Sequence, residues 1–135
     1  MDWLMAVRAF LNPSSKKSGT IRWMPLMTVY KRGAIVLLPF PFSDQSSAKI
    51  RPAIVVSPDY PSDDLIVVAV TSVGDGLRPS EFAFQFWREA GLIHPSFAKR
   101  AIASVTGSLV RKQLGQLREY DLVKLDAALK VWFGL

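Results

Sequence analysis

The sequence predicts a mainly β protein, a small open β-barrel that ends in one C-terminal α-helix. From residue 27 onward, the chain consists of short apolar runs that are rich in β-branched residues and separated by turn-forming residues. Residues 118–135 instead carry apolar residues at helical spacing. The chain has 135 residues, of which 50% are hydrophobic, and this amount suits one domain with its own core.

The first strand is expected over Ala34–Phe42, whose sequence is AIVLLPFPF. Pro39 and Pro41 each lack an N–H group, so the C-terminal half of this strand must lie at a sheet edge or run into a loop. A polar loop is expected to follow over Ser43–Lys49.

Later strands are expected over Pro52–Ser57, Leu65–Thr71, Phe82–Trp87 and Ala101–Val110, with a turn at residues 58–63 between the first two. The unbroken apolar run of Leu65–Thr71 predicts burial on both faces. Phe82–Trp87 places its phenylalanines on one face and predicts a half-buried strand. The last segment is one strand or a pair of strands, with Gly107 as a bulge or bend.

The C-terminal helix is predicted by an apolar stripe with spacings of 3, 4 and 3, formed by Leu122, Leu125, Leu129 and Trp132. Charged residues fall mostly off this stripe, namely Asp121, Lys124 and Lys130. Gly134 suits the position just beyond a helix end.

Residues 1–27 are expected to form an N-terminal extension, flexible or with a short amphipathic helix, and residues 28–135 to form the domain. Residues 1–12 place apolar side chains on one helical face, and Pro13 would end that helix. The extension carries four basic residues and one acidic residue. It is either an arm that touches RNA, membrane or a partner, or a poorly ordered addition upstream of a natural start at Met27.

The composition excludes several classes of site. The chain has no cysteine and one histidine, His94, so disulfides, thiolate nucleophiles and zinc fingers are excluded, and neither a metal nor a cofactor is expected. A net charge of +6 favours a polyanionic partner, nucleic acid first. No run approaches the roughly 18 apolar residues of a membrane span, and no convincing secretory signal is present, so a cytoplasmic protein without membrane contact is expected.

Polar residues at strand ends are the remaining candidates for a site. Arg51 precedes Pro52, which forces an extended backbone and projects the arginine at the rim of the sheet. Thr71 and Ser72 end the third expected strand. An arginine fork and a hydroxyl at neighbouring strand ends make a phosphate-binding pair. The ordinary alternative is a surface arginine and a strand-capping threonine.

Several motifs together resemble the MazF/PemK family of bacterial toxins. They are YKRGAIVLLPFPF at Tyr30–Phe42, RPAIVVS at Arg51–Ser57, AVTS at Ala69–Ser72, and a tail with LGQL at Leu114–Leu117 and DAAL at Asp126–Leu129. The similarity covers the chain from about residue 28 to the C-terminus. It implies a toxin of a type II toxin–antitoxin system with an SH3-like barrel.

The resemblance also implies an activity and its partners. Such toxins are homodimeric, metal-independent endoribonucleases that cut single-stranded RNA at short sequences, and a cognate antitoxin lies across their RNA groove. In their usual reaction the ribose 2′-hydroxyl attacks the adjacent phosphate, which leaves a 2′,3′-cyclic phosphate and a 5′-hydroxyl.

The family's paired catalytic residues correspond to Arg51 and Thr71 of this chain. Because a guanidinium stays protonated in water, Arg51 is assigned first to neutralising charge on the phosphorane and second to proton transfer, and Thr71 to positioning the phosphate. The residues expected to bind RNA beside them are Ser72, Lys49, Lys99, Arg100 and Arg78. Lys99 and Arg100 either track the RNA backbone or solvate a strand.

Two departures from the family pattern leave an alternative open. The family commonly has an acid where this chain has Ala34, and a second branch has one where this chain has Ala101. The alternative is a catalytically degenerate barrel that binds RNA or antitoxin without cutting.

Aromatic residues at Phe40, Phe42 and Trp87 either stack on bases or pack in the core or a dimer interface.

Overall fold

The computed structural model describes residues 30–40, 49–58 and 63–135 of the chain. Its strands are β1 (Ala34–Pro39), β2 (Ile50–Val55), β3 (Asp64–Thr71), β4 (Phe82–Ala83), β5 (Phe97–Thr106) and β6 (Lys112–Gln116). A 3-10 turn, η3 (Gly107–Leu109), joins β5 to β6, and the helix α3 (Glu119–Phe133) follows. The expected N-terminal extension, nearly all of the Ser43–Lys49 loop and most of the turn at 58–63 lie outside the described residues.

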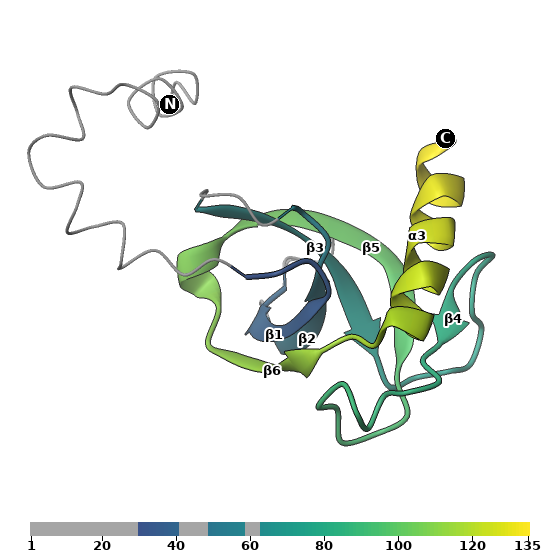
Figure 1. Ribbon diagram of the computed structural model, residues 1–135, viewed down its shortest axis with the longest axis horizontal. Helices are drawn as coiled ribbons and strands as arrows, with labels where there is room; N and C mark the ends of the chain where they lie inside the picture. Colours follow the sequence, from purple (N-terminus) through teal and green to yellow (C-terminus); the bar gives the residue numbers. More distant parts are fainter. Residues whose placement is uncertain (1–29, 41–48, 59–62) are drawn as a thin grey trace, which may run out of the picture.

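The strands pair in the order β4-β5-β3-β2-β1-β6, and every pair is antiparallel. The sheet curls around a common interior, and α3 lies outside it, next to β4 (Figure 1). This mainly β half-barrel with one C-terminal helix confirms the predicted fold class. No helix in the described segments is long and apolar enough to cross a membrane.

Alternate strand residues enter two clusters of buried side chains, one on each face of the sheet. The inner cluster, on the face turned away from α3, contains Ala34, Val36, Leu38, Phe40, Ala53, Val55, Leu65, Val67, Ala69 and Val105. The outer cluster, which α3 covers, contains Ile35, Ile54, Val68, Val70, Phe84, Ala90, Leu92, Ala98, Leu117 and Leu125. Because β3 supplies both clusters, its predicted burial on two faces is confirmed, although Ile66 near its start is 44% exposed.

The prolines of β1 have the predicted effect on its pairing. β1 pairs with β2 from Ile35 to Pro39 but with β6 only from Ala34 to Leu37. The C-terminal end of the strand therefore has a partner on one side only, as a residue without an N–H group requires.

The helix packs through its predicted stripe. Leu125 is fully buried, and Leu122, Leu129 and Trp132 pack against the outer cluster. Gly134 has a φ of 71°, and its N–H donates to the carbonyl oxygen of Val131 at 3.2 Å, which confirms its predicted place just beyond the helix end.

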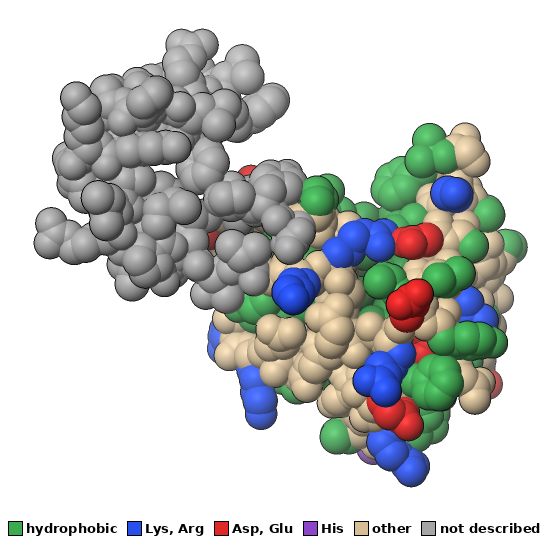
Figure 2. Space-filling view, viewed as in Figure 1, with side chains coloured by type: hydrophobic (Ala, Val, Ile, Leu, Met, Phe, Trp, Pro, Cys, Tyr) green, Lys and Arg blue, Asp and Glu red, His purple; other side chains and the backbone are tan. Residues whose placement is uncertain are grey.

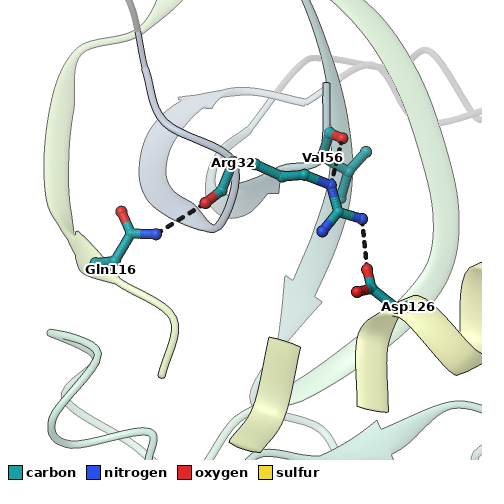
Figure 3. Close-up of polar contacts among 4 residues, drawn as sticks. All are labelled: Arg32, Val56, Gln116 and Asp126. Atoms are coloured by element: carbon teal, nitrogen blue, oxygen red, sulfur yellow. Dashed lines mark hydrogen bonds and ion pairs between the residues drawn. The ribbon is translucent and has the colours of Figure 1, made fainter. Parts of the chain in front are cut away.

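Arg32, in the turn before β1, contacts the residue that follows β2, a residue of β6 and a residue of α3 (Figure 3). Its Nε donates to the carbonyl oxygen of Val56 at 3.0 Å, and its guanidinium pairs with the carboxylate of Asp126 at 2.5 Å. The Gln116 side chain donates to the carbonyl oxygen of Arg32 at 2.9 Å. These contacts link the turn before β1 to the end of β2, to β6 and to α3.

The predicted strand Phe82–Trp87 is wrong beyond its first two residues, which form β4. The reason is Asp121, which was expected off the buried stripe but is fully buried. Its carboxylate accepts the N–H groups of Gln85 at 2.8 Å and Phe86 at 2.9 Å. These donors are thus satisfied without a partner strand, and the chain continues in turns up to Gly91.

The last strands also differ from the prediction. β5 begins earlier than Ala101, at Phe97, and ends at Thr106, and the bend predicted at Gly107 is confirmed as the start of η3. The segment Lys112–Gln116 was not predicted as a strand, because its polar residues lack an alternating pattern. It pairs with β1, which lies far away in the sequence.

Candidate functional site

The register of the β2–β3 hairpin brings Arg51 and Thr71 to the same end of the hairpin. The ladder ends at the pair Ala53–Ala69, and Arg51 and Thr71 each lie two residues beyond that pair at the same end of the hairpin. Both have the strand parity of Ala53 and Ala69, which belong to the inner cluster. The two predicted catalytic side chains therefore share the inner face at one end of the curled sheet.

Arg51 is anchored from one side by β1. It pairs with Leu38, and the following Pro52 pairs with Leu37, whereas the ladder to β3 begins only at Ala53. Arg51 is half-buried, and its Nε atom is shielded from solvent. The β-sheet thus fixes the stem of the arginine at a point where the β2–β3 hairpin opens.

Thr71 caps its strand and keeps a donor. Its Oγ1 accepts the N–H of Val73 at 3.1 Å, which is the strand-capping contact considered from the sequence. A hydroxyl has two acceptor lone pairs and one O–H donor, so this contact leaves the O–H group as a donor. Capping and phosphate binding are therefore compatible at Thr71.

Three of the expected RNA-binding residues gather around Glu81, which sequence analysis missed. Its carboxylate accepts the backbone N–H of Arg78 at 2.6 Å and that of Arg100 at 2.8 Å. Partial burial raises the pKa of Glu81, but these two hydrogen bonds and the charges of Arg78 and Lys99 outweigh that effect and hold the pKa below the usual 4.5. Glu81 is therefore ionised at neutral pH.

An irregularity in β5 lies beside this carboxylate. β3 advances from Val68 to Val70 while β5 advances from Ala98 to Ile102, so Lys99 and Arg100 fall within a bulge. Such bulges bend a strand and redirect its side chains, and they are common next to functional sites. The N–H of Arg100 inside the bulge is the group that Glu81 binds.

The bulge and the Arg51–Thr71 pair lie at the same end of the sheet. Thr71 pairs with Phe97 at the start of β5, two residues before Lys99. Lys49 and Ser72 are exposed and adjacent in sequence to β2 and β3 at that end. Basic, acidic and apolar side chains are interspersed on the described part of the face shown in Figure 2.

The remaining candidates have structural surroundings. Phe40 is 2% exposed in the inner cluster, and Trp87 packs against the outer cluster with the Arg88 guanidinium 4.9 Å from its ring centroid. Phe42 lies outside the described residues. His94 is exposed, and its carbonyl oxygen accepts the hydroxyl of Ser96. Among the described residues, no three or more His, Asp or Glu side chains group as metal ligands.

Comparison with protein families identifies the chain. Residues 31–133 match the sequence profile of the PemK-like, MazF-like toxins of type II toxin–antitoxin systems. The chain belongs to this family. The matched region contains every expected site residue, and the resemblance noted from the motifs is confirmed.

Solved structures share the PemK/MazF-like fold. MazF from Deinococcus radiodurans is 23% identical, with a TM-score of 0.66 over 80% of this chain and 99% of that one. The Mycobacterium tuberculosis toxin MazF-mt6 is 20% identical, with a TM-score of 0.62 over 76% and 97% of the two chains. An endoribonuclease from a Mycobacterial species, in complex with its cognate antitoxin, is 18% identical, with a TM-score of 0.63 over 81% and 97%. No curated protein sequence matches the chain.

Proposed function

We propose that this PemK/MazF-like toxin is a metal-independent endoribonuclease that cuts single-stranded RNA at short sequences. The observation that supports the proposal is the β2–β3 register, in which Arg51 and Thr71 each lie two residues beyond the pair Ala53–Ala69 of the inner cluster. The structurally similar Mycobacterial proteins, described as endoribonucleases, support the same activity.

The proposed reaction is a transesterification within the RNA. The 2′-hydroxyl oxygen attacks the adjacent phosphorus, the bond from phosphorus to the 5′-oxygen breaks, and a 2′,3′-cyclic phosphate and a 5′-hydroxyl result. The proton lost by the 2′-hydroxyl is balanced by the one that the leaving oxygen gains. The Arg51 guanidinium stabilises the negative charge that develops on the phosphorane, and the Thr71 hydroxyl orients a phosphate oxygen.

The partners of the toxin follow from the same family. We infer a homodimer in the cytoplasm and a cognate antitoxin that blocks RNA binding. The Deinococcus radiodurans MazE–MazF and Mycobacterial antitoxin complexes, which have this fold, support an antitoxin partner.

One experiment tests the activity directly. Purified protein is incubated with a long single-stranded RNA in EDTA, and the cut ends are mapped by primer extension. We expect cuts that leave 5′-hydroxyl ends and that disappear when the cleaved nucleotide carries a 2′-deoxy sugar, because that sugar lacks the nucleophile. Cleavage that requires added magnesium or manganese, or that persists at the 2′-deoxy nucleotide, would contradict the mechanism.

A second candidate is an RNA- or antitoxin-binding module without catalysis. This candidate is favoured by the two positions at which the family has a carboxylate and this chain has alanine. Ala34 is fully buried in the inner cluster, and Ala101 packs against that cluster. This module would bind the RNA in the same assay and leave it uncut.

A further inference from the structure

Glu81 has a position that its charge alone does not explain. Glu81 lies near the basic residues Arg78, Lys99 and Arg100. Its two carboxylate oxygens accept hydrogen bonds from the backbone N–H groups of Arg78 and Arg100. One of these groups is in the loop between β3 and β4, and the other is in the β5 bulge. The carboxylate therefore ties together two segments that each carry a basic side chain.

The loop end of this connection is a defined turn. The N–H of Glu81 donates to the carbonyl oxygen of Arg78 at 3.0 Å, with Pro79 and Ser80 between them. Ser80 has a φ of 70°, and no other non-glycine residue in the described part of the chain has a positive φ. Proline followed by a residue of positive φ is the pattern of a type II turn, in which that residue is strained unless it is glycine.

Two further contacts hold this loop. The indole Nε1 of Trp132 in α3 donates to the carbonyl oxygen of Pro79 at 3.3 Å. At the other end of the loop, a Cβ on Gly74 would lie 2.5 Å from the Phe97 ring, so the backbone approaches the start of β5 closely. The loop is thus fixed at both ends, and Glu81 joins it to the bulge.

Both carboxylate oxygens of Glu81 are occupied by N–H groups, and its pKa is held low. A group with these properties is a poor proton acceptor at neutral pH. A role in orienting its neighbours fits the geometry better than a role in proton transfer.

We propose that Glu81 is a positioning residue for RNA, which holds Arg78 of the loop and Lys99–Arg100 of the β5 bulge so that their side chains contact the phosphates of a strand crossing Arg51 and Thr71. This inference rests on the proposed function. It has an unusual consequence, because it makes an acidic residue necessary for binding a polyanion.

Electrostatics alone predicts the opposite change in RNA affinity when the charge of Glu81 is removed. A negative charge among three cations weakens their attraction for RNA, so removing it would tighten binding. Removal of an orienting group would instead weaken binding, because fewer phosphates would be neutralised by the basic side chains. The sign of the change in affinity therefore separates the two roles.

The test compares Glu81→Gln with Asp75→Asn. Asp75 is an exposed acid of the same loop, so its substitution removes the same charge and leaves the Glu81 hydrogen bonds in place. The probe is a fluorescent, 2′-O-methylated single-stranded RNA of mixed sequence, which lacks the nucleophile and cannot be cut. Kd is measured by anisotropy at salt concentrations from low to physiological, with thermal unfolding as a check of folding.

We expect Glu81→Gln to raise Kd and to reduce the slope of log K against log salt by about 0.7 for each phosphate that the protein no longer neutralises. Asp75→Asn should lower Kd or leave it unchanged. Glu81→Ala, which removes both hydrogen bonds, should have a larger effect than Glu81→Gln. The pH dependence of cleavage by Glu81→Gln should match that of the wild type, because no proton is transferred through this residue.

Glu81→Gln that binds as tightly as the wild type, or more tightly, would overturn the inference alone. A pH–rate profile of Glu81→Gln that has lost one limb would also overturn it, since Glu81 would then transfer a proton. A wild-type protein that neither binds the probe nor cuts unmodified RNA would overturn the proposed function, and with it this inference.

Discussion

Substitution of Asp121 tests how the segment before β5 is held in place. Asp121 is fully buried, and its carboxylate accepts two backbone N–H groups at 2.8 and 2.9 Å. Asp121→Ala removes both acceptors. A hydrogen bond to a charged group contributes about 1.5–3 kcal/mol, and because these two bonds are part-buried the expected decrease in stability is about 2–6 kcal/mol. Domains of this kind are stable by about 5–15 kcal/mol, so the decrease is a large part of the total.

Asp121→Asn is the finer variant. It keeps one carbonyl oxygen and replaces the other with an NH₂ group that cannot accept a hydrogen bond, so about half the decrease, roughly 1–3 kcal/mol, is expected. Both variants are measured by urea unfolding, with the free energy of unfolding extrapolated to water.

Asp126→Asn provides the matched control on the same helix. Asp126 pairs with Arg32, but the two side chains are 46% and 34% exposed. An exposed ion pair contributes about 0–1 kcal/mol, so this variant should unfold almost as the wild type does. An Asp121→Ala protein within about 0.5 kcal/mol of the wild type would contradict this account of Asp121, because surface substitutions without a structural role fall in that range.

The other predictions concern activity, pH and the N-terminal extension. Arg51→Ala should lower the rate of RNA cleavage about 10²–10³-fold, which is the usual effect of removing a group that stabilises transition-state charge. Arg51→Lys should recover only part of that rate. If Arg51→Ala shows an unchanged rate in a cleavage time course, the site lies elsewhere. Thr71→Val keeps the branched shape of the side chain and removes its hydrogen bonds, so the rate should fall while the melting temperature changes little; equal activity would exclude Thr71 from phosphate positioning. The folded state lowers the pKa of Glu81 below 4.5, so the stabilisation from its ionised form is present above pH 4.5 and is lost as the pH falls through the folded-state pKa. The difference in melting temperature between the wild type and Glu81→Gln should therefore shrink below pH 4.5. A difference that stays constant with pH would contradict this prediction. A chain that begins at Met27 should keep its melting temperature and its cleavage rate, whereas a large decrease in stability would show that the extension packs on the domain.

The fold class could be predicted because its signals are local. The apolar runs of β1, β2 and β3 are bounded by prolines and polar residues, and the stripe of α3 recurs at helical spacing. Each signal depends on residues a few positions apart. Arg51 and Thr71 were proposed as site residues from local signals too, namely their places at the ends of expected strands and the family motifs that contain them.

Other features of the fold depend on residues that are distant in the sequence. Phe82–Trp87 has the composition of a strand, but Asp121, some 35 positions away, takes two of its N–H groups and lets the chain turn. The sequence of β6 lacks alternating apolar residues, so its strand conformation depends on the pairing with β1.

The site divides in the same way between sequence and structure. The amino-acid sequence was sufficient for the fold class, the family motifs and the residue types able to bind a phosphate. The three-dimensional arrangement was needed to bring Arg51 and Thr71 to the same end of the β2–β3 hairpin and to show that Glu81 binds the backbone of both Arg78 and Arg100. This is because strand register and hydrogen bonds to the backbone of another segment arise from packing of the whole chain, and side-chain identity alone does not specify them.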